Sequence, residues 1–352
     1  MYVLLPYSSY AMNKFLYIFL FAGIFLFACN GQEQKKKSPE KTAQVQKANS
    51  LEELNRKIEE EPGNAGLYMQ RAAIYRQQIK TNDAIVDVQR AIALDTLNTA
   101  YYLVLADYYM QAGQLKNTIG VLKKVLSIEP ENTAALNKMA EINLLIRKYK
   151  DVFTYTTKAL EADPYNAKSF FIRGYTYKEM GDTGRAIENF MQTVKYEPDN
   201  YRALTELGLI YSARKNPMAV DYFNNAIAAD SSEALAWYYL AMYYQNNDML
   251  NEALDIYRDL MKHHPEFQYA YYNTGYIYLE LLKVPDEAIP YFNQALQVNP
   301  NYYEAYFNRG LCYEILGDVT RAEEDYNAAL RIRPNYQKAI DGLNRVHEIM
   351  RR

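Results

Sequence analysis

The sequence predicts an all-α fold, organised as a solenoid of stacked helix pairs, on three observations. Only 14 glycines and 12 prolines occur in 352 residues, which leaves few turns and favours helices. The residue pattern repeats about every 34 positions from residue 65 to residue 336, as the spacing of Pro130, Pro164 and Pro198 shows. The chain also contains 36 tyrosines, about a tenth of its residues, and an excess of that size requires a repeating structural cause.

Three features mark each repeat. A proline, or a hydroxyl residue in its place, ends the repeat at Thr96, Pro130, Pro164, Pro198, Ser231, Pro265, Pro300 and Pro334. A small residue lies about 24 positions earlier, at Ala72, Ala106, Ala140, Gly174, Gly208, Ala241, Gly275 and Gly310. Three positions after the small residue come Tyr75, Tyr109, Asn143, Tyr177, Tyr211, Tyr244, Tyr278 and Tyr313. Repeat five is one residue shorter than the others and repeat seven is one residue longer, so the pattern predicts eight units.

The second half of each repeat carries a small residue followed by a larger one. The small residues are Ala84, Thr118, Val152, Ala186, Ala219, Ala253, Ala288 and Ala322. The larger ones are Val88, Leu122, Thr156, Phe190, Phe223, Tyr257, Phe292 and Tyr326. Small side chains allow two helices to approach closely, and we expect the aromatic side chains to fill the space between neighbouring pairs. Proline ends the second helix, and Gly113, Gly181 and Gly317 turn the chain between the two helices.

This pattern resembles the tetratricopeptide repeat, which places an aromatic residue, Leu-Gly and Tyr on a first helix, then Ala, Phe and Ala on a second helix before a proline. Repeat six carries it as Trp237, Leu240, Ala241, Tyr244, Ala253, Tyr257 and Pro265. Repeat eight carries it as Tyr306, Gly310, Tyr313, Ala322, Tyr326, Ala329 and Pro334. The resemblance implies a right-handed superhelix of eight helix pairs over residues 65–336, with a concave groove lined by the first helices.

Helical caps are expected at both ends of the array. Ser50 and Glu53 form a capping box that opens a helix over residues 50–62, which reads as a half repeat covering the first full one. Residues 337–352 form a polar helix with a single apolar stripe, a pattern typical of a solubilising cap. The residues of the stripe are Ile340, Leu343, Val346 and Met350.

Residues 1–28 have the features of a signal peptide. An apolar run from Phe15 to Ala28 is too short to span a bilayer, which takes about 20 residues. Lys14 supplies the basic start that residues 1–11 lack, which indicates that translation begins at Met12 rather than at Met1. The run from Leu26 to Cys29 resembles the lipobox of bacterial lipoproteins, although Phe27 departs from its stricter form.

The lipobox resemblance implies that Cys29 is lipidated and becomes the membrane anchor, and two or three acyl chains would hold it there stably. Residues 29–49 are rich in lysine and glutamine and almost without apolar side chains, which predicts a disordered tether. These features place the protein in the bacterial cell envelope, as an outer-membrane lipoprotein on the periplasmic face in preference to the cell surface. The alternative is an ordinary cleaved signal peptide with an incidental cysteine.

The composition disfavours several classes of function. With 39 Lys and Arg against 42 Asp and Glu, the net charge of −3 offers no strongly basic surface for nucleic acid. Two cysteines and three histidines are too few for an ordinary zinc site, and no motif for phosphate, dinucleotide or nucleophile chemistry occurs. We therefore expect no catalytic residue, metal or cofactor. His263 and His264 are interpreted as polar contacts at a helix end, and Cys312 as a core thiol.

The remaining expectation is a binding surface in the groove of the later repeats. Its predicted residues are Phe171, Tyr175, Tyr238, Met242, Tyr269, Tyr272, Tyr276, Phe307 and Leu311. An exposed surface rich in aromatic residues and methionine marks an interaction site, because tyrosine supplies a large contact area at small entropic cost. Tyr238 and Tyr272 are expected to be exposed and to tolerate truncation, whereas Tyr278 and Tyr313 are expected to fill the joints between helices.

The sequence thus predicts a membrane-anchored scaffold or adaptor that binds protein partners in the cell envelope. Pilotins, adaptors for cell-wall hydrolases and parts of secretion machinery are examples among similar lipoproteins, and the sequence does not choose between them. An alternative is a groove that binds a glycan or peptidoglycan through stacked tyrosines, within an uptake or wall-sensing system. An enzyme that uses paired carboxylates is the least favoured reading, because no complete set of catalytic groups can be assembled.

Overall fold

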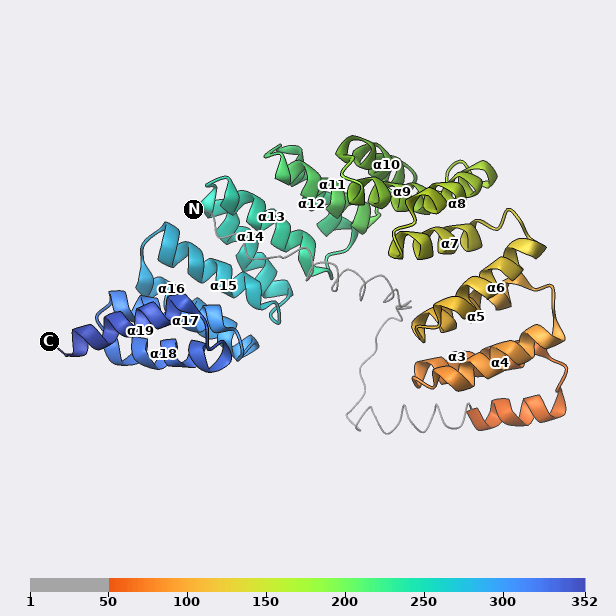
Figure 1. Cartoon of the computed structure of the whole chain (residues 1–352), viewed down its shortest axis with the longest axis horizontal. Coiled ribbons are helices and arrows are strands. Elements are labelled where there is room, and N and C mark those ends of the chain that lie inside the picture. The colour runs from red at the N-terminus through yellow and green to blue at the C-terminus, as the bar shows by residue number, and fades with distance from the viewer. Residues whose placement is uncertain (1–50, 352) are drawn as a thin grey trace, which may run out of the picture. The chain divides into compact units, whose positions relative to one another are not determined.

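The structure is a computed structural model that describes residues 51–351, and no β-strand occurs in that range. The chain divides into two compact units, one ending at Pro164 and the other beginning at Tyr165. The predicted signal peptide, Cys29, the tether and Ser50 lie outside the described residues. The all-α solenoid of paired helices is confirmed (Figure 1).

The first unit begins with residues 51–60, which are helical, and continues with three helix pairs. The pairs are α3 (Ala65–Gln77) with α4 (Thr81–Leu94), α5 (Thr99–Gln111) with α6 (Leu115–Ile128), and α7 (Thr133–Leu145) with α8 (Tyr149–Ala162). Consecutive pairs share apolar clusters, such as the one that joins Tyr102, Leu122 and Met139. Each pair therefore buries its apolar face against the next pair.

The second unit contains five helix pairs and a final helix. The pairs are α9 (Ala167–Glu179) with α10 (Thr183–Tyr196), α11 (Tyr201–Ala213) with α12 (Met218–Ala229), α13 (Ala234–Asn246) with α14 (Leu250–His263), α15 (Gln268–Tyr276) and η1 (Ile277–Leu281) with α16 (Pro285–Val298), and α17 (Tyr303–Ile315) with α18 (Val319–Ile332). Helix α19 (Gln337–Met350) packs on α18. The helix boundaries fall where the repeated proline and glycine positions place them.

The two repeats of irregular length have helices that differ from those of the other repeats. The short repeat five has a second helix, α12, of 12 residues, whereas the neighbouring second helices α10 and α14 have 14. The extra residue of repeat seven produces the π-helical turn η1, and the amide N of Val284 then reaches back to the carbonyl O of Tyr278 at 2.9 Å. A π-turn accommodates one inserted residue without rotating the rest of the helix out of register.

Glycine on the first helix and an aromatic ring on the second helix face each other within a pair. A Cβ atom added to Gly208 would lie 2.5 Å from the ring of Phe223, and one added to Gly174 would lie 2.7 Å from Phe190. The same contact recurs between Gly275 and Phe292 and between Gly310 and Tyr326. These rings therefore pack inside their own pair, which corrects the expectation that they fill the space between neighbouring pairs.

The residue on the second helix that faces the small residue is larger where the small residue is glycine than where it is alanine. Where the first helix carries alanine, at Ala72, Ala106 and Ala140, the second carries the smaller Val88, Leu122 and Thr156. Repeat six is the exception, since it places Ala241 opposite the fully buried Tyr257. The Tyr257 hydroxyl donates to Gln245 Oε1 at 2.9 Å and accepts from Asn273 Nδ2 at 3.0 Å. Two hydrogen bonds thus satisfy the hydroxyl of Tyr257, the large ring that faces an alanine and not a glycine.

The turn within each pair requires one residue in the left-handed region. Gly113, Gly181 and Gly317 have φ values of 70°, 79° and 81°, as their predicted role requires. The other five turns use Ile79, Arg147, Lys215, Asp248 and Lys283 with φ between 52° and 62°. The turn geometry is therefore a property of the repeat, and the identity of the residue is secondary to it.

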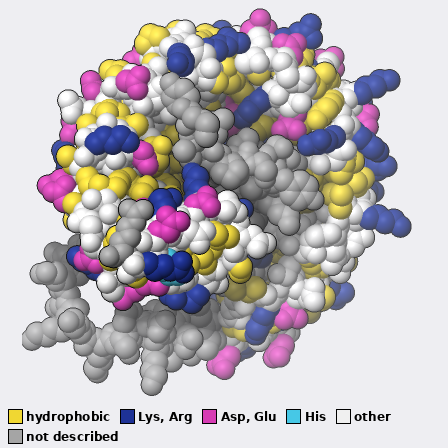
Figure 2. Space-filling view, turned by 60° about the vertical axis from the view of Figure 1, so that its left-hand side comes forward, with side chains coloured by type: hydrophobic (Ala, Val, Ile, Leu, Met, Phe, Trp, Pro, Cys, Tyr) yellow, Lys and Arg dark blue, Asp and Glu magenta, His cyan; other side chains and the backbone are white. Residues whose placement is uncertain are grey.

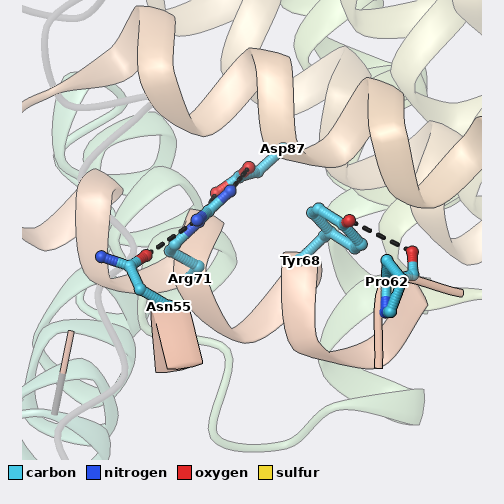
Figure 3. A network of polar contacts seen from close by, with 5 residues as sticks. All are labelled: Asn55, Pro62, Tyr68, Arg71 and Asp87. Carbon is cyan, nitrogen blue, oxygen red and sulfur yellow. Dashed lines mark hydrogen bonds and ion pairs between the residues drawn. The ribbon is translucent and has the colours of Figure 1, made fainter. Parts of the chain in front are cut away.

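The helix over residues 51–60 takes the place of a second helix in front of the first pair. Asn55 on this helix accepts a hydrogen bond from Arg71 Nη1 at 2.8 Å, while Arg71 also forms a bidentate pair with Asp87 at 2.7 and 2.8 Å (Figure 3). In repeat eight, Arg309 makes the same contacts with Asn293 on α16 and with Asp325. The arginine, asparagine and aspartate set therefore joins three successive helices in the first and the last repeat.

The final helix buries a stripe that agrees with the expected one at Val346 and differs from it elsewhere. Its buried residues are Ala339, Gly342 and Val346, and a Cβ atom on Gly342 would lie 2.6 Å from the ring of Tyr326. Met350, which the sequence placed on the packed stripe, is 43% exposed. The close approach of α19 to α18 selects the small residues for the contact, and the larger Ile340 and Leu343 lie at its border, only partly buried.

We expect Gly208→Ala to lower the free energy of unfolding by about 1–3 kcal/mol, because the new methyl group overpacks against Phe223. Gly120→Ala is the matched control, since Gly120 lies within helix α6 and its Cβ would have nothing within 4 Å. That substitution should instead stabilise by about 0.5–1 kcal/mol through helix propensity. Urea unfolding of both variants measures the difference. Equal effects of the two substitutions would contradict the packing constraint.

Candidate functional site

Five of the residues predicted to line an exposed groove are buried. The exposed fractions of Phe171, Tyr175, Tyr238, Tyr272 and Phe307 are all below 10%. The expectation that they are exposed is therefore wrong, and so is the expectation that Tyr238 and Tyr272 tolerate truncation, because removal of a buried aromatic typically costs about 3–5 kcal/mol. The rings of Phe171, Tyr272 and Phe307 contact the large ring on the second helix of their own pair, with centroids 5.8 to 5.9 Å apart. Their role in binding a partner stays a prediction.

The other four predicted residues reach the surface in part. Met242, Tyr269, Tyr276 and Leu311 are half-buried, each packed at its base against a core cluster or neighbouring helix. Of the two tyrosines expected in the joints, Tyr313 is buried, as predicted, and Tyr278 is half-buried and stacked on Tyr291 with ring centroids 5.4 Å apart. The predicted surface is therefore smaller than the sequence indicated.

A continuous series of ring contacts joins repeats six and seven. We name it the aromatic seam and define it as Tyr238, Phe267, Tyr269, Tyr272 and Tyr302. The centroids of successive rings lie 4.7 to 6.2 Å apart, and most pairs are tilted or edge to face. Phe267 and Tyr269 are partly exposed, so the seam combines a buried base with an accessible upper edge. Edge-to-face rings hold one another rigidly, which preorganises a contact surface.

Two rings of the seam come from a position that the sequence analysis missed. Phe267 and Tyr302 are the N-cap residues of α15 and α17, and Tyr336 occupies the same position before α19. In four earlier repeats this position is an asparagine whose side chain caps the following helix, at Asn64, Asn132, Asn166 and Asn200. The change from asparagine to an aromatic residue was visible in the sequence. It replaces a local cap with a ring that packs beside the first helices.

The last repeat has a similar group of rings. Tyr336 packs edge to face on Tyr303 and Phe307, with centroids 4.9 and 5.4 Å away. The guanidinium of Arg333 lies 5.0 Å from the centre of the Tyr303 ring. Burial raises the pKa of Tyr336. The aromatic residues before the first helices thus extend the same kind of surface from repeat six to the end of the chain.

Two buried hydroxyl groups of the seam differ in their partners. The Tyr272 hydroxyl accepts a hydrogen bond from Asn308 Nδ2 at 3.0 Å. The Tyr302 hydroxyl is buried and has no hydrogen-bond partner among the described residues, although its ring centroid lies 4.7 Å from that of Tyr272. Burial raises the pKa of both phenols, so both carry their proton at neutral pH. The Tyr302 hydroxyl is therefore an unused donor within the seam.

A basic and aromatic group lies in repeats four and five. The guanidinium of Arg202 is 4.8 Å from the centre of the Phe171 ring. Glu206, only 6% exposed, accepts a hydrogen bond from the Tyr175 hydroxyl and pairs with Lys178. Burial and the nearby Glu206 carboxylate raise the pKa of Tyr175. Because Lys178 neutralises Glu206, Arg202 gives this end of the second unit a positive side chain beside an aromatic ring.

The histidine and cysteine residues have structural contacts. His264 Nε2 lies 3.1 Å from the carbonyl O of Ser231, which confirms the predicted polar contact at a helix end. The His263 ring instead stacks on Trp237 with ring centroids 5.5 Å apart, an aromatic contact in place of the predicted polar one. The thiol of Cys312 is fully buried, and burial raises its pKa to about 12. This confirms a core thiol, since a thiolate is the reactive form of cysteine.

Within residues 51–351, no group of three or more His, Cys, Asp or Glu side chains is arranged to hold a metal ion. In the same range, no helix has both the length and the apolar character needed to cross a membrane. Hydrophobic side chains reach the surface as small groups between charged ones on the face that Figure 2 shows.

Comparison with known proteins identifies the repeated unit. Three sequence models described as tetratricopeptide repeat match the chain, one at residues 173–217 and 278–337, another at residues 155–188 and the third at residues 235–266. No curated protein sequence matches the chain. Together these matches cover repeats in the second unit and the end of the first.

Two solved structures are also similar to the chain. The C-terminal part of a TPR repeat-containing protein from Cytophaga hutchinsonii is 18% identical with a TM-score of 0.58, over 68% of this chain and 99% of that one. A tetratricopeptide repeat protein from Parabacteroides merdae is 19% identical with a TM-score of 0.47, over 71% of this chain and 98% of that one. At these identities the first similarity supports the fold alone.

We expect Tyr302→Phe to maintain or raise the stability, by up to about 1 kcal/mol, because it removes a buried hydroxyl without a partner. Tyr272→Phe is the matched variant in the same seam, and it should cost about 1–2 kcal/mol because it leaves the buried amide of Asn308 unsatisfied. Urea unfolding at neutral pH compares the two. A larger loss for Tyr302→Phe than for Tyr272→Phe would contradict the assigned hydrogen bonds.

Proposed function

Because the chain belongs to the tetratricopeptide repeat family, we propose that it is a scaffold that binds a segment of a partner protein on the aromatic seam of its second unit. Arrays of helix pairs present an extended surface, which suits protein–protein interaction. We assign the interaction surface to the aromatic seam and its chemistry to aromatic side chains. Catalysis is no part of this role, since the residues of the seam are aromatic and uncharged.

The observation that supports this location is the group of accessible apolar side chains that neighbouring rings hold in place. Phe267, Tyr269 and Met242 offer half-buried apolar surface fixed by neighbouring rings, and Tyr and Met are common in interaction surfaces. A partner segment with apolar side chains fits these groups.

The positive charge of Arg202, beside Phe171, adds a preference for a negatively charged group on the partner. Arg202 can bind a carboxylate of the partner while its guanidinium stays over the aromatic ring. The rings of the seam contact one another mostly edge to face or tilted, so they offer edges more than flat faces. Stacking on a sugar needs a flat ring face, and this geometry therefore favours a peptide over a glycan.

We further propose that the scaffold works at a membrane of the bacterial envelope. The apolar run before Cys29 and the lysine-rich stretch after it support a lipoprotein anchored in the bacterial envelope, on the periplasmic face of the outer membrane. Residues 30–49 would let the folded repeats stand roughly 25 Å from the lipid, at about 5–6 Å times the square root of the number of residues. A tethered array of this kind can hold partners near the membrane.

Met242→Glu should weaken partner capture at least tenfold while the array stays folded, because a charge replaces half-buried apolar surface beside the seam. Met191→Glu on α10 is the matched control, since Met191 is 46% exposed and lies outside the seam. Crosslinking in intact cells followed by quantitative capture compares the partners bound by each variant. Unchanged capture by Met242→Glu, or sedimentation of the wild-type chain with peptidoglycan in place of a protein, would contradict the proposal.

Cys29→Ala should release the protein from the membrane fraction into the periplasm or block its processing, because the lipid attachment site is lost. Fractionation of cells that produce either form, with mass measurement of the amino-terminal peptide, provides the readout. Cys312→Ser serves as the control for the loss of a thiol, since Cys312 is buried in the core. If the Cys29→Ala chain remains with the membrane and is cleaved normally, Cys29 is not the anchor.

A further inference from the structure

An exposed apolar patch lies where the turns of repeats seven and eight and the end of the final helix come together. We name it the C-terminal patch and define it by six residues, Leu281, Leu282, Ile315, Leu316, Ile349 and Met350. Each side chain of the patch is between 42% and 58% exposed. Soluble proteins commonly expose single apolar residues, but a contiguous group of this kind marks an interaction site.

Contacts between the helices hold the members of the patch next to one another. Leu279, two residues before the patch in repeat seven, shares a buried cluster with Cys312 of repeat eight. The guanidinium of Arg345 on α19 donates to both carboxylate oxygens of Glu314, at 2.6 and 2.8 Å. Ile349 follows Arg345 by one helical turn, so the end of α19 lies beside the turn of repeat eight.

The turns themselves do not require apolar residues at these positions. Residues 281–282 and 315–316 directly precede the residue with positive φ in the turns of repeats seven and eight. The same two positions are Ala and Arg at residues 213–214 of repeat five, and both are Asn at residues 246–247 of repeat six. Because polar side chains serve the same backbone geometry there, the apolar residues of repeats seven and eight indicate a role outside the turn itself.

The charges around the patch do not favour a partner of one sign. Four pairs close within the chain, Glu280 with Lys283, Asp318 with Arg321, Glu314 with Arg345 and Glu323 with His347, at 3.1, 2.6, 2.6 and 2.8 Å. The other exposed charged residues of the segments 278–288, 313–322 and 345–351 are Asp286, Glu287, Glu348 and Arg351. The two acidic residues of repeat seven lie at one end of the patch, and Glu348 and Arg351 lie at the other end. The rim therefore contains both signs, and an equally mixed rim on the partner would match it.

The outer face of α19 disfavours one way of joining two copies. Its exposed side chains include Lys338, Asp341, Asn344 and Glu348, so this face is polar. A polar outer face on the terminal helix keeps another array from stacking on it end to end. Two copies can instead meet at their edges, which gives a closed pair and not a growing fibre.

We propose that the C-terminal patch is covered by the same patch of a second copy of this chain, related to the first by a twofold axis. A twofold contact buries the same apolar residues on both copies, and it sets the repeat-seven end of one patch against the α19 end of the other. Asp286 and Glu287 then face Arg351 of the second copy, which places opposite charges across the contact. The axis passes through the middle of the patch, near Leu316.

An anionic bilayer is the competing occupant of this apolar surface, and the charges argue against it. Asp286, Glu287 and Glu348 would face the negative headgroups. Outside the ion pairs, Arg351 is the basic residue of these segments that would oppose the repulsion. The patch is also distinct from the aromatic seam, whose N-cap rings lie at the start of the first helices, whereas the patch follows their ends. The inference therefore concerns a second surface and goes beyond the proposed scaffold function.

A cysteine at position 316 of the full chain tests the position of the axis. Lysed cells that produce Leu316→Cys are treated with copper phenanthroline, which oxidises two thiols that meet to a disulfide. We expect at least half of this chain to migrate at twice the monomer mass on a non-reducing gel. Leu97→Cys is the matched control, since Leu97 is 70% exposed in the first unit, and less than a tenth of it should form this product. Cys312 is buried, and the parent chain measures any reaction at Cys29.

Two further sets of substitutions separate a specific contact from chance collision. Leu281→Ser and Leu282→Ser, added to Leu316→Cys, should reduce the cross-linked product at least fivefold without loss of helicity, because both side chains are exposed. Asp286→Lys and Glu287→Lys should reduce the product as well. Arg351→Glu on the same chain should restore it, since opposite charges then face each other again.

A dimer that persists after Leu281→Ser and Leu282→Ser, or equal products at residues 316 and 97, would overturn the proposal. A Leu316→Cys product that contains a different protein would overturn it too, as would binding of the patch to phosphatidylglycerol vesicles in place of a dimer. Met242→Glu, added to Leu316→Cys, should leave the cross-linked product unchanged. Failure of the proposed scaffold function is thereby distinguished from failure of this inference.

Discussion

The close contact between a small residue on the first helix and a large residue on the second helix is the constraint on which the array depends. At Gly208 the ring of Phe223 occupies the volume that any Cβ atom would need, and three other glycines face rings in the same way. The two helices of each such pair can approach only because this volume is free. A fixed distance within the pair then fixes where the next pair must pack.

The placement of the tyrosines follows from this spacing. Once the helices of a pair are close together, the next first helix leaves room for rings such as Tyr238 and Tyr272, and these become part of the core. The proposed binding surface is consequently the accessible edge of a packed layer. Its accessible residues, among them Phe267 and Tyr269, are held in place by contacts with buried rings.

The residue before each first helix shows how one position serves two purposes. In the early repeats, asparagine at this position satisfies the backbone of the following helix, as Asn132 does for Ala135. In the later repeats, Phe267 and Tyr302 give up this cap and contribute a ring to the seam. The loss of a cap costs stability, and the ring contacts offset it through burial. The early and the late repeats therefore differ in chemistry while sharing one backbone design, and the change falls within the second unit, to which Asn166 and Asn200 also belong.

The sequence by itself determined the helix pairs, their number and their turns, because proline, glycine and alanine act through local backbone geometry and recur at fixed spacing. It also indicated correctly that Cys312 is a core thiol. Tertiary structure alone decided which aromatic side chains are accessible, since the exposure of Tyr272 or Phe307 depends on the position of the neighbouring pair and not on the helix that carries it. The bidentate pairing of Arg71 and Arg309 and the lone hydroxyl of Tyr302 were hidden for the same reason. Such contacts join residues of different helices, whose separation is fixed only when the helices pack.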